Sequence, residues 1–203
     1  MYLKRTIRVA AAFLLSASLW AVTPSPASAA TTYRGDGDDI ITLNRTAVGI
    51  AKITYSGEGH FAVVGLDKNG EMGQLLVNDL DGYTGVVPYN TDTGDRLYGL
   101  EVTADGPWTI QLLPLSKAKY WAITSRGGTD QVLRLTKTST GLHTLRVRYT
   151  GDGHFAVLAL NAKGRYHSLL VNDLDGYNGR VRLPAGTRYV QVDADGPWTM
   201  VRK

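Results

Sequence analysis

The chain has 203 residues, of which 43% are hydrophobic and 20% charged, with 23 glycines, 7 prolines and no cysteine. This composition is ordinary for one or two globular domains and excludes collagen-like, coiled-coil and wholly disordered chains. The lack of cysteine excludes disulfide bonds, thiolate zinc sites and a cysteine nucleophile. The net charge of +4 points toward polyanions, but its distribution along the chain changes that interpretation.

Residues 1–30 have the three parts of a secretory signal peptide. Three basic residues precede an apolar run, Val9–Leu19, and the small residues of Ala27–Ala29 form a cleavage site. The run is shorter than the roughly 20 residues that span a bilayer. We therefore expect a secreted, extracellular or wall-associated protein without a membrane span after cleavage. Cleavage after residue 30 leaves 19 Lys and Arg against 18 Asp and Glu, a net charge of +1.

Three motifs occur twice in the remaining chain, in the same order. The matching pairs are Gly57–Val63 and Gly151–Val157, Leu75–Tyr83 and Leu169–Tyr177, and Ala104–Thr109 and Ala194–Thr199. A repeated order of motifs indicates a tandem duplication. We therefore divide the chain into a signal peptide, a first module, a linker and a second module, which are residues 1–30, 31–115, 116–124 and 125–203.

Each module is predicted to consist of short strands separated by turns, without a helix. The predicted strands, rich in β-branched, leucine and aromatic residues, are Thr42–Arg45, Ile50–Tyr55, Phe61–Leu66, Gln74–Asn78, Leu97–Thr103, Trp108–Leu113 and Thr144–Tyr149. About seven strands per module, with frequent turns, are typical of a sandwich. The sequence predicts an all-β fold with two tandem antiparallel β-sandwich modules, Ig-like or jelly-roll-like, after the signal peptide. The alternative for each module is a small barrel.

The shared Asp-Gly motifs are expected to form turns, because Asp can bond its own backbone and Gly accepts a positive φ. In the motif Asp-Gly-Pro-Trp-Thr, Trp108 and Trp198 are predicted to be buried apolar side chains. The alternative is that both tryptophans are exposed platforms on which a sugar stacks.

The four histidines give no support for an active site. His60 and His154 follow Gly-x-Gly turns, with no candidate nucleophile beside them in the sequence. We therefore predict that the protein is not an enzyme. A structure with His143 or His167 beside a carboxylate in a deep cleft would reverse that prediction.

Aspartates clustered in turns make calcium the one cofactor to consider, because calcium binds oxygen ligands on loops. The candidate ligands are Asp38, Asp79, Asp81, Asp130, Asp173 and Asp175. We favour turn formation over calcium for these residues, so no cofactor and no metal site are predicted.

Charge distinguishes the two modules. Residues 31–115 have five basic residues against 12 acidic ones, a net charge of −7, whereas residues 116–203 have 14 against six, a net charge of +8. The alternation of the sequence places Arg146 and Arg148 on one face of a strand, and Arg180 and Arg182 likewise. This surface would be larger if four further residues lay nearby, namely Arg134, Lys137, Arg165 and Arg188. Arginine suits bidentate contact with phosphate or carboxylate.

Three interpretations of this asymmetry remain open. The charges are solvated faces that keep modules apart, or the basic module docks on an acidic one within a chain or between copies. In the third, Arg146, Arg148, Arg180 and Arg182 bind an anionic cell-wall polymer. Nucleic acid is not expected as a partner, since the sequence has no recognition helix and no aromatic-basic RNA motif.

The run Gly-x-Gly-His-Phe-Ala-Val, Leu-Leu-Val-Asn, Gly-Tyr-x-Gly and Ala-Asp-Gly-Pro-Trp-Thr resembles a module of secreted proteins and lipoproteins from actinobacteria and other Gram-positive bacteria. The resemblance covers nearly all of residues 31–203, twice. It implies an extracellular β-sandwich without an assigned activity, so no functional residues are transferred. The cysteine of lipoprotein members is missing here.

The sequence thus predicts a secreted, non-catalytic binding or structural protein of the cell envelope. One alternative is an inhibitor of a hydrolase or protease, which would present the segment Val87–Arg96 as an exposed loop cleavable at Arg96. The other is a calcium-dependent carbohydrate-binding protein.

Overall fold

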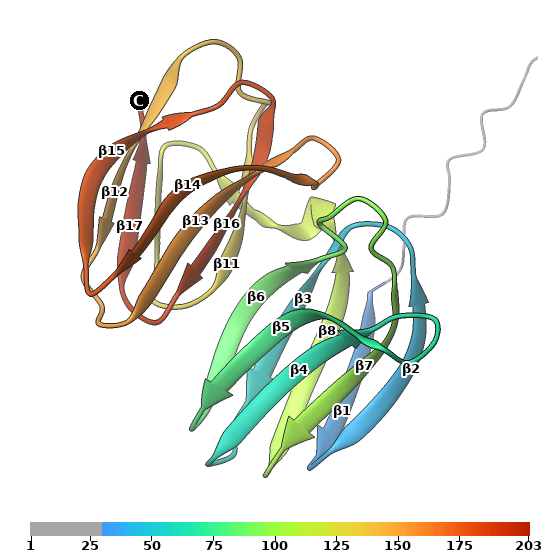
Figure 1. Cartoon of the computed structure of the whole chain (residues 1–203). Coiled ribbons are helices and arrows are strands. Elements are labelled where there is room, and N and C mark those ends of the chain that lie inside the picture. The colour runs from blue at the N-terminus through green and yellow to red at the C-terminus, as the bar shows by residue number, and fades with distance from the viewer. Residues whose placement is uncertain (1–29) are drawn as a thin grey trace, which may run out of the picture.

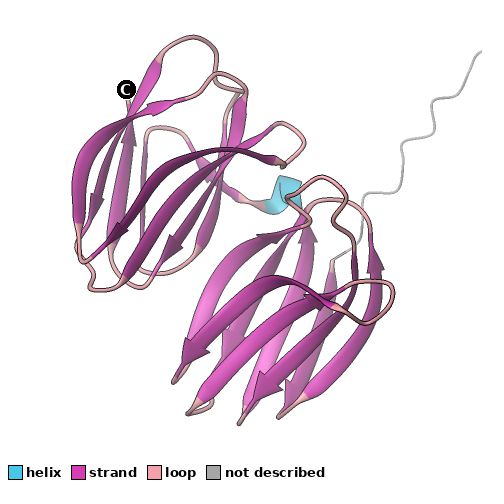
Figure 2. Cartoon of the chain, in the orientation of Figure 1, coloured by secondary structure: helices cyan, strands magenta, loops and turns pink. Residues whose placement is uncertain are grey.

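The computed structural model describes residues 30–203, which form two β-sandwiches joined by a short connection (Figures 1 and 2). The predicted signal peptide lies outside the described residues except for Ala30. The first sandwich contains β1 (Thr31–Asp36), β2 (Asp39–Arg45), β3 (Gly49–Tyr55), β4 (His60–Leu66), β5 (Met72–Leu80), β6 (Tyr83–Tyr89), β7 (Leu97–Ala104) and β8 (Pro107–Pro114).

The second sandwich follows a single 3₁₀ turn, η1 (Leu115–Lys117). Its strands are β9 (Lys119–Trp121), β10 (Thr124–Gly127), β11 (Gln131–Leu135), β12 (His143–Tyr149), β13 (His154–Asn161), β14 (Tyr166–Leu174), β15 (Tyr177–Leu183), β16 (Thr187–Ala194) and β17 (Trp198–Arg202). The predicted all-β class is therefore confirmed. Residues 30–203 contain no helix that is long and apolar enough to cross a membrane.

The two sandwiches share one topology. In the first, the sheets have the strand orders β1-β8-β3-β6 and β2-β7-β4-β5, and in the second β10-β17-β12-β15 and β14-β13-β16-β11-β9. Strands β10 to β17 therefore repeat β1 to β8 in order. Apart from the added strand β9, each sandwich has two antiparallel four-stranded sheets connected in the way that defines a jelly roll. Of the two predicted sandwich types, the jelly roll is therefore the one found.

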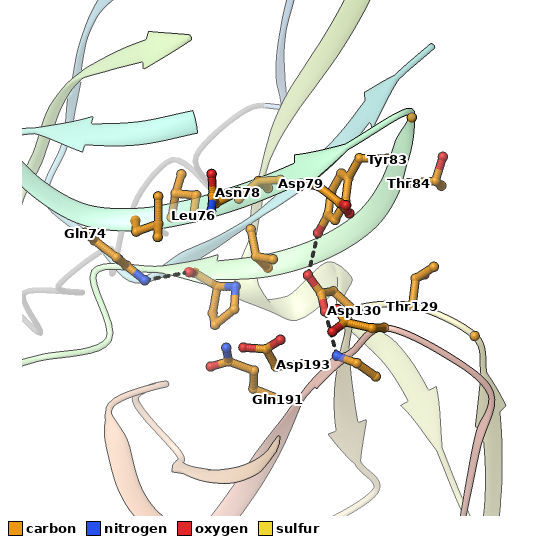
Figure 3. Close-up of a pocket in the computed structure, with 18 residues that line it drawn as sticks. Gln74, Leu76, Asn78, Asp79, Tyr83, Thr84, Thr129, Asp130, Gln191 and Asp193 are labelled. Carbon is orange, nitrogen blue, oxygen red and sulfur yellow. Dashed lines mark hydrogen bonds between the residues drawn. The ribbon is translucent and has the colours of Figure 1, made fainter. Parts of the chain in front are cut away.

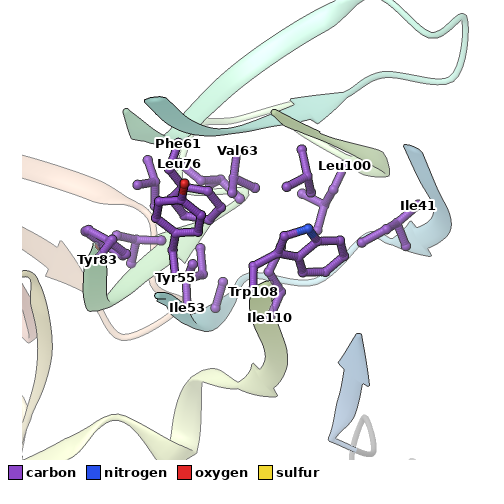
Figure 4. Close-up of a cluster of buried hydrophobic side chains, with 14 of the residues drawn as sticks. Ile41, Ile53, Tyr55, Phe61, Val63, Leu76, Tyr83, Leu100, Trp108 and Ile110 are labelled. Carbon is purple, nitrogen blue, oxygen red and sulfur yellow. The ribbon is translucent and has the colours of Figure 1, made fainter. Parts of the chain in front are cut away.

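Each core contains the same aromatic stack. The rings of Tyr55 and Phe61 lie parallel with their centroids 4.4 Å apart (Figure 4). Tyr149 and Phe155 repeat this contact at 4.5 Å in the second sandwich. Offset stacking of buried rings adds to the apolar area that they remove from water. The residues that recur in the sequence therefore build the same core in both sandwiches.

The two tryptophans of the repeated motif are buried. Trp108 is 3% exposed and Trp198 is 2% exposed. Their Nε1 atoms donate to the carbonyl oxygens of Gly37 (2.8 Å) and Thr129 (3.0 Å), which satisfies the indole N–H inside the core. The alternative role as sugar-stacking platforms is wrong, because neither ring reaches the solvent.

The Asp-Gly motifs form the predicted turns between β5 and β6 and between β14 and β15. Asp81 and Asp175 have φ angles of 57° and 60°, a left-handed conformation that Asp tolerates better than most residues. Asp81 Oδ1 accepts a hydrogen bond from Gly59 N at 2.7 Å, and Asp175 Oδ1 accepts one from Gly153 N at 3.2 Å. The two carboxylates therefore tie neighbouring turns together.

Most of the segment predicted as a linker, residues 116–124, belongs to the second sandwich, because β9 lies within it and β10 begins at its end. Strand β9 pairs in parallel with β11, where Trp121 lies opposite Leu135. Trp121 is only 1% exposed and belongs to the second core. The boundary between the modules therefore lies at η1, close to Leu115.

The sandwiches contact one another through an apolar cluster. The first contributes Ile50, Val86 and Leu113, which point outward from one sheet, and the connection contributes Leu115 and Ala118. The second contributes Val132, Leu160 and Tyr189 from its five-stranded sheet. The contact between the modules therefore buries apolar side chains, and no ion pair crosses it among residues 30–203.

Candidate functional site

A group of like charges lies on the outer face of the sheet β10-β17-β12-β15. Along β12, Leu145 and Val147 point into the core and are fully buried, while Arg146 and Arg148 alternate with them and are exposed. Strand β15 likewise exposes Arg180 and Arg182. The alternation of a strand therefore places all four predicted arginines on one surface.

Strand pairing brings these side chains together. Strands β12 and β15 are neighbours, and Arg146 lies directly opposite Arg180. On the other side of β12, Arg148 lies opposite Thr199 of β17, which itself lies opposite Arg126 of β10. We call the surface formed by Arg126, Arg146, Arg148, Arg180 and Arg182 the arginine face.

Nothing on the sheet itself neutralises the arginine face. The sequences of β10, β12, β15 and β17 contain no Asp or Glu. Within residues 30–203, none of the five arginines has a carboxylate at ion-pairing distance. Directly opposed like charges destabilise a pair of strands, so the Arg146–Arg180 pair is a cost to the fold that a bound anion would offset.

The corresponding sheet of the first module has no such surface. The positions of Arg146 and Arg148 are occupied there by Lys52 and Thr54. The positions of Arg180 and Arg182 are occupied by Val86 and Pro88. Because both modules have the same topology, the fold does not require the arginine face.

Sequence reasoning identified four of the five arginines but missed Arg126. The available signal was the repeat, since Arg126-Gly127 matches Arg34-Gly35 at the start of the first module. Three of the four residues that could have extended this surface lie elsewhere. Arg134 and Arg188 lie on the opposite sheet of the second sandwich, and Arg165 Nη1 donates to the carbonyl oxygens of Asn90 (2.7 Å) and Asp92.

A cavity of about 490 Å³ lies between the two modules (Figure 3). At its edge, Tyr83 of the first module donates a hydrogen bond through its hydroxyl to Asp130 Oδ2 of the second, at 2.6 Å. Asp130 Oδ1 also accepts a hydrogen bond from Ala194 N at 2.9 Å. Asp79, Asp193 and Asp195 complete the acidic lining of the cavity.

Burial, more than its neighbours, sets the protonation of Asp130. Desolvation raises the pKa of Asp130 to about 6, against the opposing effect of the hydrogen bonds from Tyr83 and Ala194. Desolvation and the nearby Asp130 carboxylate also raise the pKa of the Tyr83 hydroxyl, so this group stays neutral. The Tyr83–Asp130 contact between the modules therefore holds a carboxyl group that titrates near pH 6.

The stability of the protein is expected to fall as the pH rises from 3.8 to above 6, because the folded state binds this proton more tightly than the unfolded state does. A shift of this size corresponds to about 3 kcal/mol for a fully buried group, and the partial solvent contact of Asp130 reduces it to about 2 kcal/mol. Urea denaturation across this pH range measures how steeply the free energy of unfolding changes with pH. The slope is expected to flatten in Asp130→Asn, whose amide oxygen can still accept the Ala194 N–H. An unchanged slope in that variant would assign it to another group.

The six calcium candidates have three repeated backbone roles. Asp38 and Asp130 accept from the N–H of Ala104 and Ala194, and Asp81 and Asp175 accept from glycines in the neighbouring turn. The carboxylates of Asp79 and Asp173 accept from the N–H of the next residue. In the described part of the chain, no group of three or more acidic or histidine side chains is arranged to hold a metal ion.

The histidines lie at strand ends and edges. His60 Nε2 is 2.8 Å from Asn78 Oδ1, and His154 Nδ1 is 3.4 Å from Asp193 Oδ1. His167 Nε2 lies 2.9 Å from the carbonyl oxygen of Ala185 rather than beside a carboxylate. His143 is the first residue of β12, opposite Leu183.

The segment proposed as an inhibitor loop is not presented to solvent as a whole. Its first residues belong to β6, and Tyr89 and Asn90 are buried. The carbonyl of Thr91 accepts from Tyr166 N of the second module at 3.0 Å. The segment is thus part of the contact between the modules, which does not fit a loop that inserts into a protease.

No protein-family profile and no curated protein sequence matches the chain. Among solved structures it is similar to a cAMP-bound PfPKA-R, with 8% identity over 85% of this chain and 70% of that chain, and a TM-score of 0.23. A second similar structure is the regulatory subunit of a cAMP-independent protein kinase A from Trypanosoma cruzi bound to guanosine. The identity is 9% over 85% of this chain and 72% of that chain, and the TM-score is 0.22. At such low TM-scores neither structure bears on the ligand of this chain.

Proposed function

We propose that the chain is a secreted, non-catalytic protein of the cell envelope that binds an anionic wall polymer through the arginine face. The observation that carries this proposal is the placement of Arg146 directly opposite Arg180, with Arg148 and Arg182 beside them and no acidic residue on the four strands. The signal-peptide pattern of residues 1–30 and the resemblance to secreted Gram-positive modules support the location.

The shape of the surface favours a polymer over a single small anion. Successive outward positions on one strand are about 7 Å apart, and neighbouring strands about 4.8 Å apart. The arginine face therefore spans the sheet from β10 to β15 as an open surface. A chain of regularly spaced phosphodiesters, as in teichoic acid, can contact several guanidinium groups at once, each with bidentate geometry.

Sedimentation with purified Gram-positive walls tests this proposal, with the chain from Thr31 to Lys203, which contains every described strand. We expect it to bind walls that retain teichoic acid, to bind less as salt rises because the contacts are ionic, and not to bind walls stripped of teichoic acid. The double variant Arg146→Glu, Arg148→Glu is expected to lower binding at least tenfold, since it reverses two exposed charges.

The first module supplies a matched control. Arg34→Glu with Lys52→Glu makes the same change in net charge on the equivalent sheet, where the side chains are also exposed. We expect this variant to bind like the unmodified chain. Equal losses in the two double variants would show that only net charge matters, and binding to stripped walls would point to an acidic polysaccharide or peptidoglycan instead. Either result, or no binding at low salt, contradicts the proposal.

A further inference from the structure

The contact between the two modules uses a different surface of each. The first module contributes the outer face of β3, β6 and β8, through Ile50, Val86 and Leu113. The second contributes the outer face of β11, β13 and β16, through Val132 and Leu160 among others. Such a contact is heterologous, and it leaves one copy of each surface unused in every chain. The free β15 surface is the set of positions in the second module that correspond to contact residues of the first, namely Leu142, Arg180, Arg182 and Lys203. The free β2 surface is the set in the first module that corresponds to contact residues of the second, namely Ile40, Glu71 and Glu101.

The free surfaces keep exposed apolar residues at positions that the used surfaces bury. Ile40 of β2 corresponds to Val132, and it is 68% exposed where Val132 is fully buried. Leu142, which precedes β12, corresponds to Val48, which packs against the apolar cluster, yet Leu142 is 78% exposed. A single exposed apolar side chain needs no explanation, but each of these two lies where the other module buries its counterpart in a contact, so a repeat of that contact would cover both.

The free surfaces have also acquired opposite charges. On the free β15 surface, Arg180 and Arg182 replace Val86 and Pro88, and Lys203 replaces Leu113. On the free β2 surface, Glu101 replaces Gln191 and Glu71 replaces Arg165. Complementary potentials favour association of two surfaces, whereas like charges would keep them apart.

One pair shows this directly. Pro88 and Gln191 line the cavity between the modules from its two sides. Their counterparts on the free surfaces are Arg182 and Glu101, so a repeated contact would place a cation and an anion across the corresponding cavity. Ile40 lies opposite Glu101 in the pairing of β2 with β7, which puts the apolar and the acidic parts of the free β2 surface side by side.

We propose that copies of this chain associate head to tail, with the free β15 surface of one copy on the free β2 surface of the next, in the geometry of the contact between the modules. The opposite net charges of the two modules would then attract one another across the contact between copies. A heterologous contact of this kind closes into a ring or continues as a filament. The proposal does not depend on wall binding, although both would use Arg180 and Arg182.

Sedimentation velocity on the chain from Thr31 to Lys203, over a hundredfold range of concentration, tests this proposal. At low salt the sedimentation coefficient is expected to rise with concentration, and high salt should suppress the rise because the charges are exposed. Two variants reverse one surface each: Arg180→Glu with Arg182→Glu, and Glu71→Lys with Glu101→Lys. Each is expected to lower the association constant at least tenfold. These side chains lie at the surface, and circular dichroism verifies that both variants fold.

Mixing the two variants gives the decisive result. In the mixture each reversed surface meets an opposite charge on the other variant, so association is expected to return. Arg126→Glu with Arg148→Glu, on the same sheet but outside the free β15 surface, is expected to lower wall binding while association persists. A sedimentation coefficient independent of concentration at low salt, association that survives either reversal, or a mixture that stays monomeric would each overturn the proposal.

Discussion

Replacing Trp121 with alanine is expected to lower the free energy of unfolding by about 3–5 kcal/mol, as for other large buried aromatic residues. The side chain is 1% exposed, its Nε1 donates to the Ile123 carbonyl oxygen at 3.1 Å, and the guanidinium of Arg202 lies 5.8 Å from the ring centroid. Urea denaturation followed by circular dichroism measures the loss. The result matters because Trp121 lies in the segment that the sequence predicts to be a linker.

The neighbouring residue provides the control. Tyr120 is 57% exposed, so Tyr120→Ala is expected to change the free energy of unfolding by no more than about 0.5 kcal/mol. Similar small effects at both positions would mean that β9 is not part of the second core.

Gly127→Ala is expected to lower the free energy of unfolding by about 3 kcal/mol, which is at the upper end of the range for overpacked sites. A Cβ atom at this position would lie 2.4 Å from Cζ2 of Trp198. The indole ring cannot move aside, since it is buried and its N–H is bonded to Thr129. The same collision at Gly35, where the Cβ would lie 2.3 Å from Trp108 Cζ2, shows that the repeated Gly–Trp pair is a packing unit.

Gly128→Ala is the matched control for this prediction. No atom lies within 4 Å of the added methyl group, and the backbone is not left-handed. This variant is expected to change the free energy of unfolding by no more than about 0.5 kcal/mol. The change is a small increase in stability if the substitution lowers the entropy of the unfolded chain. Thermal unfolding of both variants compares them, and equal losses would refute the steric explanation.

Enrichment in β-branched, leucine and aromatic residues predicted six of the eight strands of the first module, all except β1 and β6. Strand β6 was missed, since Gly85 and Pro88 both weaken a strand pattern. The structure accommodates Pro88 because β6 is the edge of its sheet. The strand β9 was missed for another reason: three residues are too few to show a period, and their pairing depends on β11 (Gln131–Leu135), which comes later in the chain.

The candidate site was predictable in its residues but not in its arrangement. Alternation alone places Arg146 with Arg148 and Arg180 with Arg182. That Arg146 faces Arg180 follows from the pairing of β12 with β15, strands separated in the sequence by β13 and β14. Local sequence carries no information about such a pairing. The same limit hid the contact of Tyr83 with Asp130, which joins residues 47 positions apart.

The parallel pairing of β9 with β11 bears on aggregation. A sheet edge with unpaired backbone groups invites addition of a strand from another chain, and natural proteins cover or interrupt such edges. In the second sandwich β9 covers the edge of β11. In the first, the equivalent strand β2 is an edge interrupted by a register shift between Thr42 and Arg45. Loss of β9 would therefore uncover a regular edge, whereas the irregular edge of β2 is already a poor template for amyloid-like addition.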